Sequence, residues 1–280
     1  MTIFDAYNDT KSKLRAAGIE DFVFEAKQII KYVTGYTNKE ILLNYTEALT
    51  GFQSDCLNAV VNERLTRYPL QYILGFWDFY GRRFKVGPGV LIPRQDTETV
   101  IEVCLELLKD AKDPHVLDLC AGTGCIGITI AAEKEDSSVT LIEKYEEAAD
   151  YLAENLKQNA PENAKLIVGD VFEKCATEGK YDLIVSNPPY IKSGDIEKLQ
   201  PEVKHEPFSA LDGGEDGLLF YGFIAKEYKD SLNPGGSIVF EIGFDEAQAV
   251  KEILEANGYT SVTVKKDYYD NDRVIFGTVK

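Results

Sequence analysis

The chain reads Val116-Leu-Asp-Leu-Cys-Ala-Gly-Thr-Gly-Cys-Ile-Gly-Ile-Thr-Ile-Ala131 where an apolar run meets a glycine-rich turn. The run at 116–120 is typical of a strand buried on both faces of a sheet, and residues 124–131 predict the helix that follows it. Gly122 and Gly124 let the backbone at the start of this helix approach a ligand closely. The order of strand, glycine turn and helix predicts the first unit of an α/β fold.

The same alternation of strands and helices continues along the chain. Further strands are expected at 139–142, 165–168, 182–185, 237–241, 261–264 and 273–276, and helices at 145–158, 217–231 and 245–257. The sequence therefore predicts an α/β domain with a Rossmann-like, mainly parallel sheet of seven strands. In such doubly wound sheets, ligands bind at the carboxyl ends of the strands.

The first part of the chain has a helical pattern instead. Up to about residue 68, apolar residues recur at helical spacing, and Gly18, Gly35 and Gly51 stand near the expected breaks. This pattern predicts a bundle of four or five short helices at 1–68. Because no residue in it offers catalytic chemistry, we expect a domain that packs against or docks a partner protein.

Residues 69–93 are rich in aromatic and β-branched side chains. Two short strands at 76–80 and 84–86, joined by a turn, predict a β-hairpin, and a third extended run is expected at 90–92. We expect this segment to link the helical domain to the α/β domain at 94–280, whose first helix opens after Pro93.

The charge balance limits the partners of the protein. Among 280 residues, 47 are acidic and 30 basic, which gives a net charge of −17. A protein that grips nucleic acid needs a cationic surface, so we expect no direct nucleic-acid binding and favour a basic protein partner. The chain shows no secretory leader and no apolar run of about 18 residues, which predicts a cytoplasmic protein without a membrane segment. The composition does not set the oligomeric state, and a monomer is the simplest expectation.

The cysteines are odd in number and scattered. With only two histidines besides, the sequence favours neither a disulfide framework nor a metal site. The residues concerned are Cys56, Cys104, Cys120, Cys125, Cys175, His115 and His205.

A stiff turn, Asn187-Pro188-Pro189-Tyr190, follows the fourth expected strand of the sheet. Two consecutive prolines lack N–H groups, fix their own φ and restrict the residue before them. An amide, two carbonyls and an aromatic ring are thus presented in one geometry, which suits a planar nitrogen nucleophile. The alternative is a turn that only ends a buried strand.

Acidic residues accompany the other strand ends. Glu143 follows the glycine turn by about 20 residues, where an acid can accept the hydroxyls of a ribose. Asp170 can accept a hydrogen bond from an adenine amine, with Val171 and Phe172 packing on the base, or can simply form a turn. From the glycine turn, Asp118 and Glu143 alone, an NAD-binding enzyme stays an alternative.

Taken in order along the chain, these strand ends resemble the class I methyltransferases that bind S-adenosylmethionine. Over nearly its whole length the chain resembles the HemK/PrmC family, which methylates the glutamine N5 of peptide chain release factors. The likeness rests on residues 69–75, 90–94, 97–98, 186–191, 206–207, 210–214, 216–217, 241–243 and 272–273.

The resemblance implies transfer of a methyl group from S-adenosylmethionine, leaving S-adenosylhomocysteine. The acceptor would be the glutamine of the Gly-Gly-Gln loop in class I release factors, which the helical domain helps to grip. The implied cofactor contacts are Asp118, Ala121, Gly122, Gly124, Glu143, Asp170, Val171, Phe172 and Asn187. The implied substrate contacts are Asn187, Pro188, Pro189 and Tyr190, of which Asn187, Pro188 and Tyr190 are the expected catalytic residues. In this hypothesis the Asn187 side-chain oxygen and the Pro188 carbonyl accept the amide N–H groups, and the Tyr190 ring packs on the amide plane.

The chain departs from the family pattern at a few positions. Gln95-Asp96 replaces a Pro-Glu pair, Cys120-Ala121 replaces Gly-Thr, and Glu143 replaces a frequent Asp while keeping its chemistry. Arg94 could cover the cofactor or meet the substrate, but a salt bridge is the expected role. Glu241 ends a buried strand, so it is either structural or a substrate contact.

Other functions remain open at this point. An adenine-amine methyltransferase of DNA or RNA shares Asn-Pro-Pro-Tyr but should carry a basic groove. A ribosomal-protein glutamine is another possible target, and a non-catalytic adaptor would keep the fold only for docking.

Overall fold

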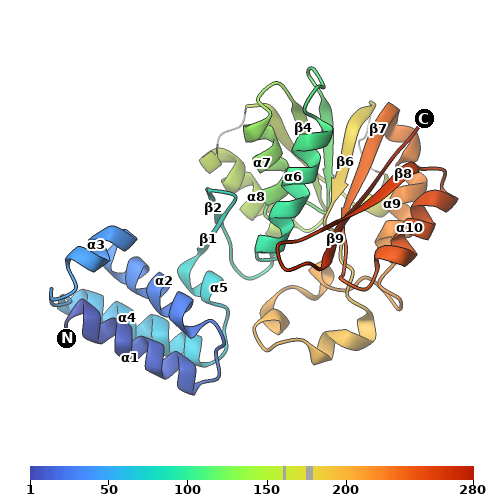
Figure 1. Cartoon of the computed structure of the whole chain (residues 1–280). Helices are drawn as coiled ribbons and strands as arrows, with labels where there is room; N and C mark the ends of the chain where they lie inside the picture. The colour runs from blue at the N-terminus through green and yellow to red at the C-terminus, as the bar shows by residue number, and fades with distance from the viewer. Residues whose placement is uncertain (160–161, 175–178) are drawn as a thin grey trace. The chain divides into compact units, whose positions relative to one another are not determined.

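The computed structural model describes residues 1–159, 162–174 and 179–280 (Figure 1). Cys175, one of the five scattered cysteines, lies outside the described residues. The chain divides into two compact units. The first comprises Met1–Gly75 together with Gln200–His205, and the second comprises Phe76–Leu199 and Glu206–Lys280.

The first unit is the expected helical bundle. Its helices are α1 (Ile3–Ala16), α2 (Phe22–Thr34), α3 (Asn38–Leu43), α4 (Gly51–Leu65) and α5 (Leu70–Leu74). Capping boxes at Thr2, Thr37 and Thr50 satisfy the free N–H groups at three helix starts. Helix α5 occupies part of the 69–93 segment, where the sequence suggested extended chain, and Gly75 ends it with φ at 78°.

A buried arginine ties the loop segment 200–205 to this unit. Arg64 on α4 is 3% exposed, and its Nε lies 2.7 Å from Glu25 Oε2. Its Nη2 lies 2.9 Å from Glu202 Oε1, which also lies 2.8 Å from Arg67 Nε. Since a buried cation is costly unless it is paired, these carboxylates account for its place in the core.

The second unit begins with the expected hairpin, β1 (Phe76–Phe79) and β2 (Arg82–Lys85). Tyr80 and Gly81 both have positive φ, as a two-residue turn between twisted strands requires. The strand expected at 90–92 was wrong: this run is turn and irregular chain, and Ile92 N donates to the Glu206 carboxylate instead of to a strand. The helix predicted after Pro93 is confirmed as a short 3₁₀ turn, η1 (Gln95–Thr97), followed by α6 (Glu98–Leu107).

A seven-stranded sheet forms the centre of this unit and confirms the predicted fold class (Figure 1). Its order is β5-β4-β3-β6-β7-β9-β8. The first five of these are parallel, whereas β9 is antiparallel to both β7 and β8. The strands are β3 (His115–Leu119), β4 (Ser138–Glu143), β5 (Ala164–Val168), β6 (Tyr181–Ser186), β7 (Leu232–Glu241), β8 (Thr260–Lys266) and β9 (Asp272–Thr278).

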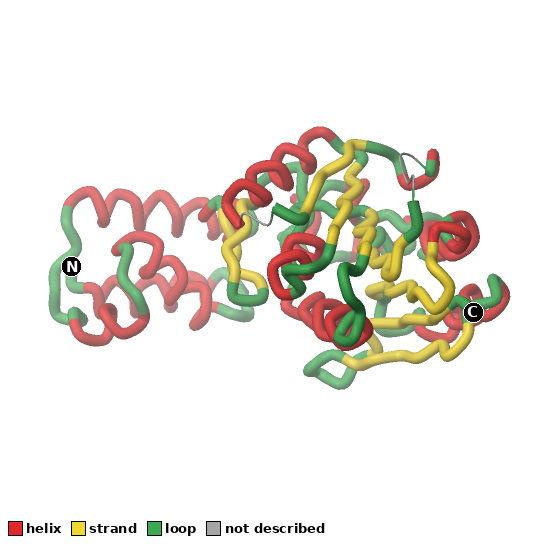
Figure 2. The backbone as a smooth tube through the Cα atoms, turned by 90° about the horizontal axis from the view of Figure 1, so that it is seen from above, coloured by secondary structure: helices red, strands yellow, loops and turns green. Residues whose placement is uncertain are grey.

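Helices flank the strands of the sheet (Figure 2). They are α7 (Cys125–Glu133), α8 (Glu146–Asn159), α9 (Leu219–Glu227) and α10 (Ala247–Ala256). The helix predicted at 217–231 is shorter than expected, since a 3₁₀ turn at Lys229–Ser231 follows α9. The long connection between β6 and α9 holds only three short 3₁₀ turns, at Ser193–Lys198, Val203–His205 and Phe208–Ala210.

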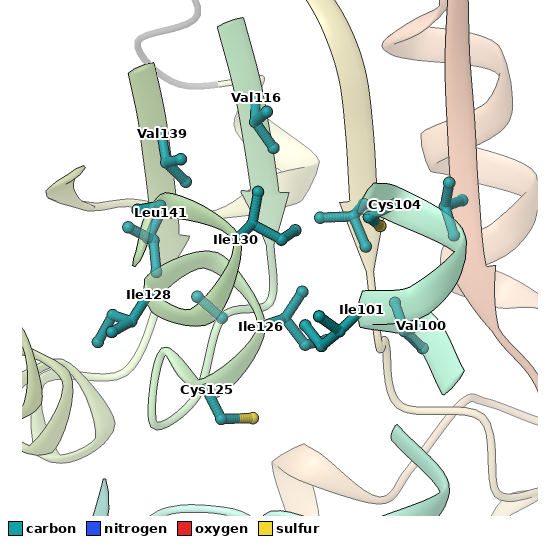
Figure 3. Close-up of a cluster of buried hydrophobic side chains, with 14 of the residues drawn as sticks. Val100, Ile101, Cys104, Val116, Cys125, Ile126, Ile128, Ile130, Val139 and Leu141 are labelled. Atoms are coloured by element: carbon teal, nitrogen blue, oxygen red, sulfur yellow. The ribbon is translucent and has the colours of Figure 1, made fainter. Parts of the chain in front are cut away.

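Two apolar layers cover the two faces of the sheet. Neighbouring strand residues such as Val116 and Leu117 belong to different clusters of buried side chains, because successive side chains point to opposite faces. Figure 3 shows one layer, in which Ile126, Ile128 and Ile130 of α7 lie near side chains of β3, β4 and α6. Burial thus explains the largely apolar sequence of α7, whose N-terminus is held at the carboxyl end of β3.

Candidate functional site

A cleft lies at the carboxyl ends of β3, β4, β5 and β6. Its walls include residues 89–94, 120–123, 142–145 and 169–172, together with Thr97, Cys125, Asn187, Pro189 and Phe220. The sheet therefore brings the glycine turn, both acidic turns and the Asn187 turn to one place, as the strand order predicted.

The glycine turn joins β3 to α7. Gly122 has φ of 54°, and its N–H donates to Glu143 Oε2 at 2.8 Å. Gly124 begins α7 with φ of 78°, and a β-carbon there would lie 2.9 Å from Ile128 Cδ1 and 3.0 Å from Leu152 Cγ. Ala121 and Gly122 line the cleft, whereas Gly124 does not and instead gives α7 and α8 room to pack. A direct cofactor contact from Gly124 finds no support in this arrangement.

Asp118 also lies behind the cleft wall rather than in it. Its carboxylate is fully buried, and Oδ2 accepts a hydrogen bond from Gly127 N at 2.8 Å. Oδ1 has no partner among the described residues, and burial raises the pKa of this carboxyl to about 7. The geometry supports a role in holding the start of α7, not the predicted direct contact with a cofactor.

Glu143 ends β4 and lines the cleft. Its two carboxylate oxygens accept hydrogen bonds from Gly122 N and from Tyr145 N, the latter at 2.9 Å. Burial raises the pKa of the carboxyl, and these backbone donors oppose that effect. Because a carboxylate has about four acceptor positions, two remain for hydroxyl groups of a ligand.

Asp170 lines the cleft after β5. Its Oδ1 accepts from Phe172 N at 2.9 Å, and its Oδ2 lies 2.7 Å from Lys144 Nζ. Burial opposes ionisation, yet the hydrogen bonds from Lys144 and Phe172 N hold the pKa of the carboxyl below its usual value. Asp170 is therefore an ionised acceptor at the cleft edge.

Aromatic side chains form one apolar wall. Phe172 lines the cleft and packs on Phe220 and Phe223, with ring centroids 4.9 and 4.8 Å apart. Val171 is buried beside it and its carbonyl accepts from Tyr228 Oη. The sequence did not predict Phe220, because it lies on α9, about 50 residues beyond Asp170.

The Asn-Pro-Pro-Tyr turn is anchored by the end of β6. Ser186 Oγ donates to Leu119 O at 2.7 Å, a buried bond between β6 and β3. Asn187 and Pro189 line the cleft, whereas Pro188 and Tyr190 do not.

Tyr190 instead lines a second hollow with Lys192, Phe244, Glu246 and Arg273. Burial is the main cause of the raised pKa of its phenol. The side chain that follows the two prolines therefore lies outside the cleft lining. The predicted packing of Tyr190 on a substrate amide therefore finds no support in this arrangement.

The chain after the turn is fixed by a short ladder. Ile191 N donates to Leu211 O and Gly213 N donates to Ile191 O, both at 2.9 Å. Ser193 Oγ donates to Asp212 Oδ1 at 2.5 Å. Asp212 thus forms the turn of this ladder, and its Oδ1 also accepts from Gly214 N at 3.1 Å.

Arg94 forms the expected salt bridge, with Glu206 as its partner. The Glu206 side chain is 1% exposed and also accepts from Ile92 N at 3.0 Å. Through these two bonds Glu206 holds the irregular run 90–94 in place, and that run forms a whole wall of the cleft. Sequence reasoning missed this role, because a carboxylate 112 residues away along the chain fixes the wall.

The described residues offer neither a membrane span nor a metal-binding cluster. No helix in the described parts of the chain has the length and apolar character needed to cross a membrane. Among residues 1–159, 162–174 and 179–280, no group of three or more His, Cys, Asp or Glu side chains is arranged to hold a metal ion.

Two family models match the chain. Residues 84–209 match the methyltransferase small domain, and residues 5–75 match the PrmC N-terminal domain. Both matches agree with the division into a helical unit and an α/β unit.

Curated relatives match almost the whole chain. A release factor glutamine methyltransferase of Fusobacterium nucleatum is 38% identical over 97% of this chain and 77% of that protein. A protein of the same name in Thermodesulfovibrio yellowstonii is 40% identical over 90% of this chain and 90% of its own length. Another, in Geobacter sulfurreducens, is 35% identical over 99% of this chain and 97% of its own length. This chain belongs to the release factor glutamine methyltransferase family. Its methyl donor is S-adenosylmethionine.

Solved structures show the same fold at lower identity. A methyltransferase from Pyrococcus furiosus has a TM-score of 0.53 at 23% identity, covering 71% of this chain and 89% of its own. The hMettl16 catalytic domain, solved with a MAT2A 3'UTR hairpin, has a TM-score of 0.56 at 16% identity. The match covers 70% of this chain and 74% of that domain's chain. These likenesses confirm the class I methyltransferase fold of the α/β unit.

The cleft of this chain fits S-adenosylmethionine. Gly122 lines the cleft with φ of 54°, and without a β-carbon its backbone is open to close approach by a ligand. Glu143 offers acceptors for ribose hydroxyls, and Asp170 offers one for the adenine amine beside the Phe172 ring. Bound there, the cofactor supplies a methyl group activated by a sulfonium.

Proposed function

We propose that this protein transfers a methyl group from S-adenosylmethionine to the side-chain amide nitrogen of the glutamine in the Gly-Gly-Gln loop of class I peptide chain release factors. The observation that carries the proposal is the position of Asn187 in the same cleft as Gly122 and Glu143. The methyl donor's binding residues and an acceptor for amide N–H groups thus share one site. The near full-length relatives named for release factor glutamine support the choice of substrate.

The protein's task in this reaction is to orient a weak nucleophile. The lone pair of an amide nitrogen is delocalised into the carbonyl, so the nitrogen must be held in line with the methyl group. In this proposal Asn187 Oδ1 accepts one of its two N–H bonds, in a turn that Pro188 and Pro189 make rigid. The Pro188 carbonyl, predicted to accept the other, belongs to a residue outside the cleft lining. Orientation of this kind can contribute roughly 7–11 kcal/mol to lowering a barrier.

The helical unit is the proposed docking surface for the release factor. In this proposal residues 1–68 dock the substrate, residues 69–93 link, and residues 94–280 catalyse. The net charge of −17 supports a basic protein surface as the partner and disfavours nucleic acid. We place the enzyme in the cytoplasm, where release factors work, and expect it to act as a monomer.

Methyl transfer from labelled S-adenosylmethionine tests the proposal. The purified protein is incubated with a class I release factor, with the same factor carrying alanine in place of the Gly-Gly-Gln glutamine, with ribosomal proteins, or with duplex DNA. We expect label only in the intact release factor, on the glutamine identified by peptide mass spectrometry. Label in DNA would establish the adenine-amine alternative, and label in a ribosomal protein would identify that protein as the substrate instead. No label in any sample would favour a non-catalytic adaptor.

A further inference from the structure

Two buried polar atoms near the cleft have no hydrogen-bond partner. Glu241 is 1% exposed and Thr97 is 2% exposed. Within the described residues, Glu241 Oε2 and Thr97 Oγ1 both lack a partner. Since buried polar atoms are nearly always hydrogen-bonded, a pair of unpaired atoms from distant parts of the chain calls for a functional explanation.

The sheet places Glu241 beside the Asn187 turn. In the parallel pair of β6 and β7, Ser186 lies opposite Phe240, so Asn187 and Glu241 are the next residues at the same sheet edge. Phe240 packs in one apolar layer and Val239 in the other. Side-chain alternation therefore directs Glu241 to the face that carries α6, at whose start Thr97 lies.

Of Glu241 and Thr97, Thr97 is the one that borders the cleft. The Thr97 hydroxyl is nevertheless close enough to favour the ionised form of the Glu241 carboxyl. A hydroxyl in this position can pass a proton from the cleft to a carboxylate behind it.

The cations facing Glu241 pair with other carboxylates. Arg94 pairs with Glu206, and Arg273 lies 3.1 Å from Asp267 Oδ2 and 3.4 Å from Asp96 Oδ2. The other titratable groups that act on Glu241 are the carboxyl of Asp96, the thiol of Cys125 on α7, and the phenols of Tyr190 after β6 and Tyr221 on α9. Burial raises the pKa of Glu241 to about 7, so this carboxyl can both take up and give up a proton near neutral pH.

We propose that Glu241 receives, through the Thr97 hydroxyl, the proton that the substrate amide must lose. This inference rests on the proposed function. The amide nitrogen forms a bond to the methyl carbon while the carbon–sulfur electron pair stays on sulfur. The N–H proton then passes to Thr97 Oγ1, and the hydroxyl proton of Thr97 passes to Glu241 Oε2. The positive charge brought by the sulfonium and the negative charge of Glu241 cancel, and Glu241 later returns the proton to water.

The proposal predicts a specific pH dependence of methyl transfer. Only ionised Glu241 can accept a proton, so kcat should rise with pH through about 7. Glu241→Gln keeps the shape of the side chain but removes this acceptor. We expect kcat to fall about 100-fold or more in this variant and the rise near pH 7 to disappear, as is typical for loss of a general base. Thr97→Val should behave like Glu241→Gln, whereas Thr97→Ser should retain the pH-dependent rise.

Glu246→Gln provides a matched control. Glu246 is 5% exposed and also has a raised pKa, but its Oε2 accepts from Gly243 N at 2.9 Å and from Tyr221 Oη at 3.2 Å. It lines the second hollow rather than the cleft. Its variant should keep the rise of kcat near pH 7.

Two measurements independent of turnover accompany the kinetics. Burial also raises the pKa of Asp118 to about 7, so infrared difference spectra are recorded on proteins that carry Asp118→Asn. The free Asp118→Asn protein should show a protonated carboxyl band that titrates near pH 7, and this band should be missing when Glu241→Gln is added. The dissociation constant of S-adenosylhomocysteine should change less than about threefold. The inference is overturned if Glu241→Gln retains the kinetic rise, if the titrating band persists, or if weaker product binding and a lower Tm account for the lost activity. If the wild type transfers no methyl group to a release factor at any pH, the proposed function itself fails.

Discussion

Gly213 lies directly against the backbone of Tyr190. A β-carbon at Gly213 would stand 2.7 Å from Tyr190 Cα and 2.8 Å from its carbonyl carbon, distances that real side chains do not adopt. The glycine is therefore required by close approach of two backbones, one of which is the last residue of the Asn-Pro-Pro-Tyr turn.

Gly213→Ala should displace that turn. We expect methyl transfer to fall at least tenfold and stability to fall by about 1–3 kcal/mol, as in overpacked cores. The control is Gly222→Ala in α9, where an added β-carbon meets nothing within 4 Å and alanine should be neutral or stabilising. Steady-state kinetics measure methyl transfer and thermal unfolding measures stability, for each of the two variants. Unchanged kinetics and Tm in Gly213→Ala would show that the backbones separate without cost.

Asn187→Ala tests the acceptor for the substrate amide. Methyl transfer should become undetectable, while affinity for S-adenosylhomocysteine should stay within a few-fold of the wild type, because the Glu143 and Asp170 contacts remain. Calorimetric titration and transfer of labelled methyl groups separate the two effects. Surviving turnover in Asn187→Ala would refute the assigned role.

Glu143→Gln tests the ribose-binding assignment. The change replaces the Glu143 carboxylate, which accepts hydrogen bonds from Gly122 N and Tyr145 N, by a neutral amide. Hydrogen bonds to charged groups contribute about 1.5–3 kcal/mol. The dissociation constant of S-adenosylhomocysteine should rise roughly 10- to 100-fold. Glu146→Gln, in the exposed first turn of α8, is the control and should leave this dissociation constant unchanged. If the two variants bound S-adenosylhomocysteine with equal affinity, Glu143 would not be a cofactor-binding residue.

Asp118→Asn tests the pH dependence of stability. The carboxyl has a pKa of about 7 when folded, against 3.8 as its ordinary value, so the folded protein holds a proton that the unfolded chain releases. Stability should therefore fall as pH rises from about 4 to 7, and this group contributes on the order of 4 kcal/mol to the fall. The asparagine variant should show a smaller decrease in Tm over this range. An identical decrease would mean that Asp118 is ionised in the folded protein.

Glu202→Gln tests the attachment of segment 200–205 to the helical unit. It weakens the ion pairs to Arg64 and Arg67 and should speed hydrogen exchange in residues 200–205. KM for the release factor should rise several-fold, with little change in S-adenosylhomocysteine binding. Glu215→Gln, at an exposed position, should change neither quantity. Unaltered exchange in Glu202→Gln would show that other contacts hold the segment.

The sequence predicted those features that depend on local pattern. Alternating strands and helices identified all seven strands, and the ends of β4, β5 and β6 led to Glu143, Asp170 and Asn187. Short-range signals sufficed because parallel strands bring their carboxyl ends together regardless of the details of packing.

Features that depend on tertiary contacts were missed. Residues 90–92 have strand composition, yet the buried Glu206 carboxylate takes the N–H of Ile92. Residues 70–74 form α5 although their neighbours favour extended chain. Likewise, the direction in which Tyr190 leaves the Pro-Pro turn depends on the packing of Gly213 and cannot be obtained from the motif alone.

The ladder between Ile191–Ser193 and Leu211–Gly214 closes the base of the long connection between β6 and α9. Because the base is closed, the length of the intervening chain costs little, since the entropy of a loop changes slowly with the number of residues in it. Insertions or exchanges at residues 194–199, which leave Glu202 and Glu206 in place, can thus alter the exposed surface of this connection while Asn187 keeps its position. The outer part of the connection and the cleft can therefore change independently of each other.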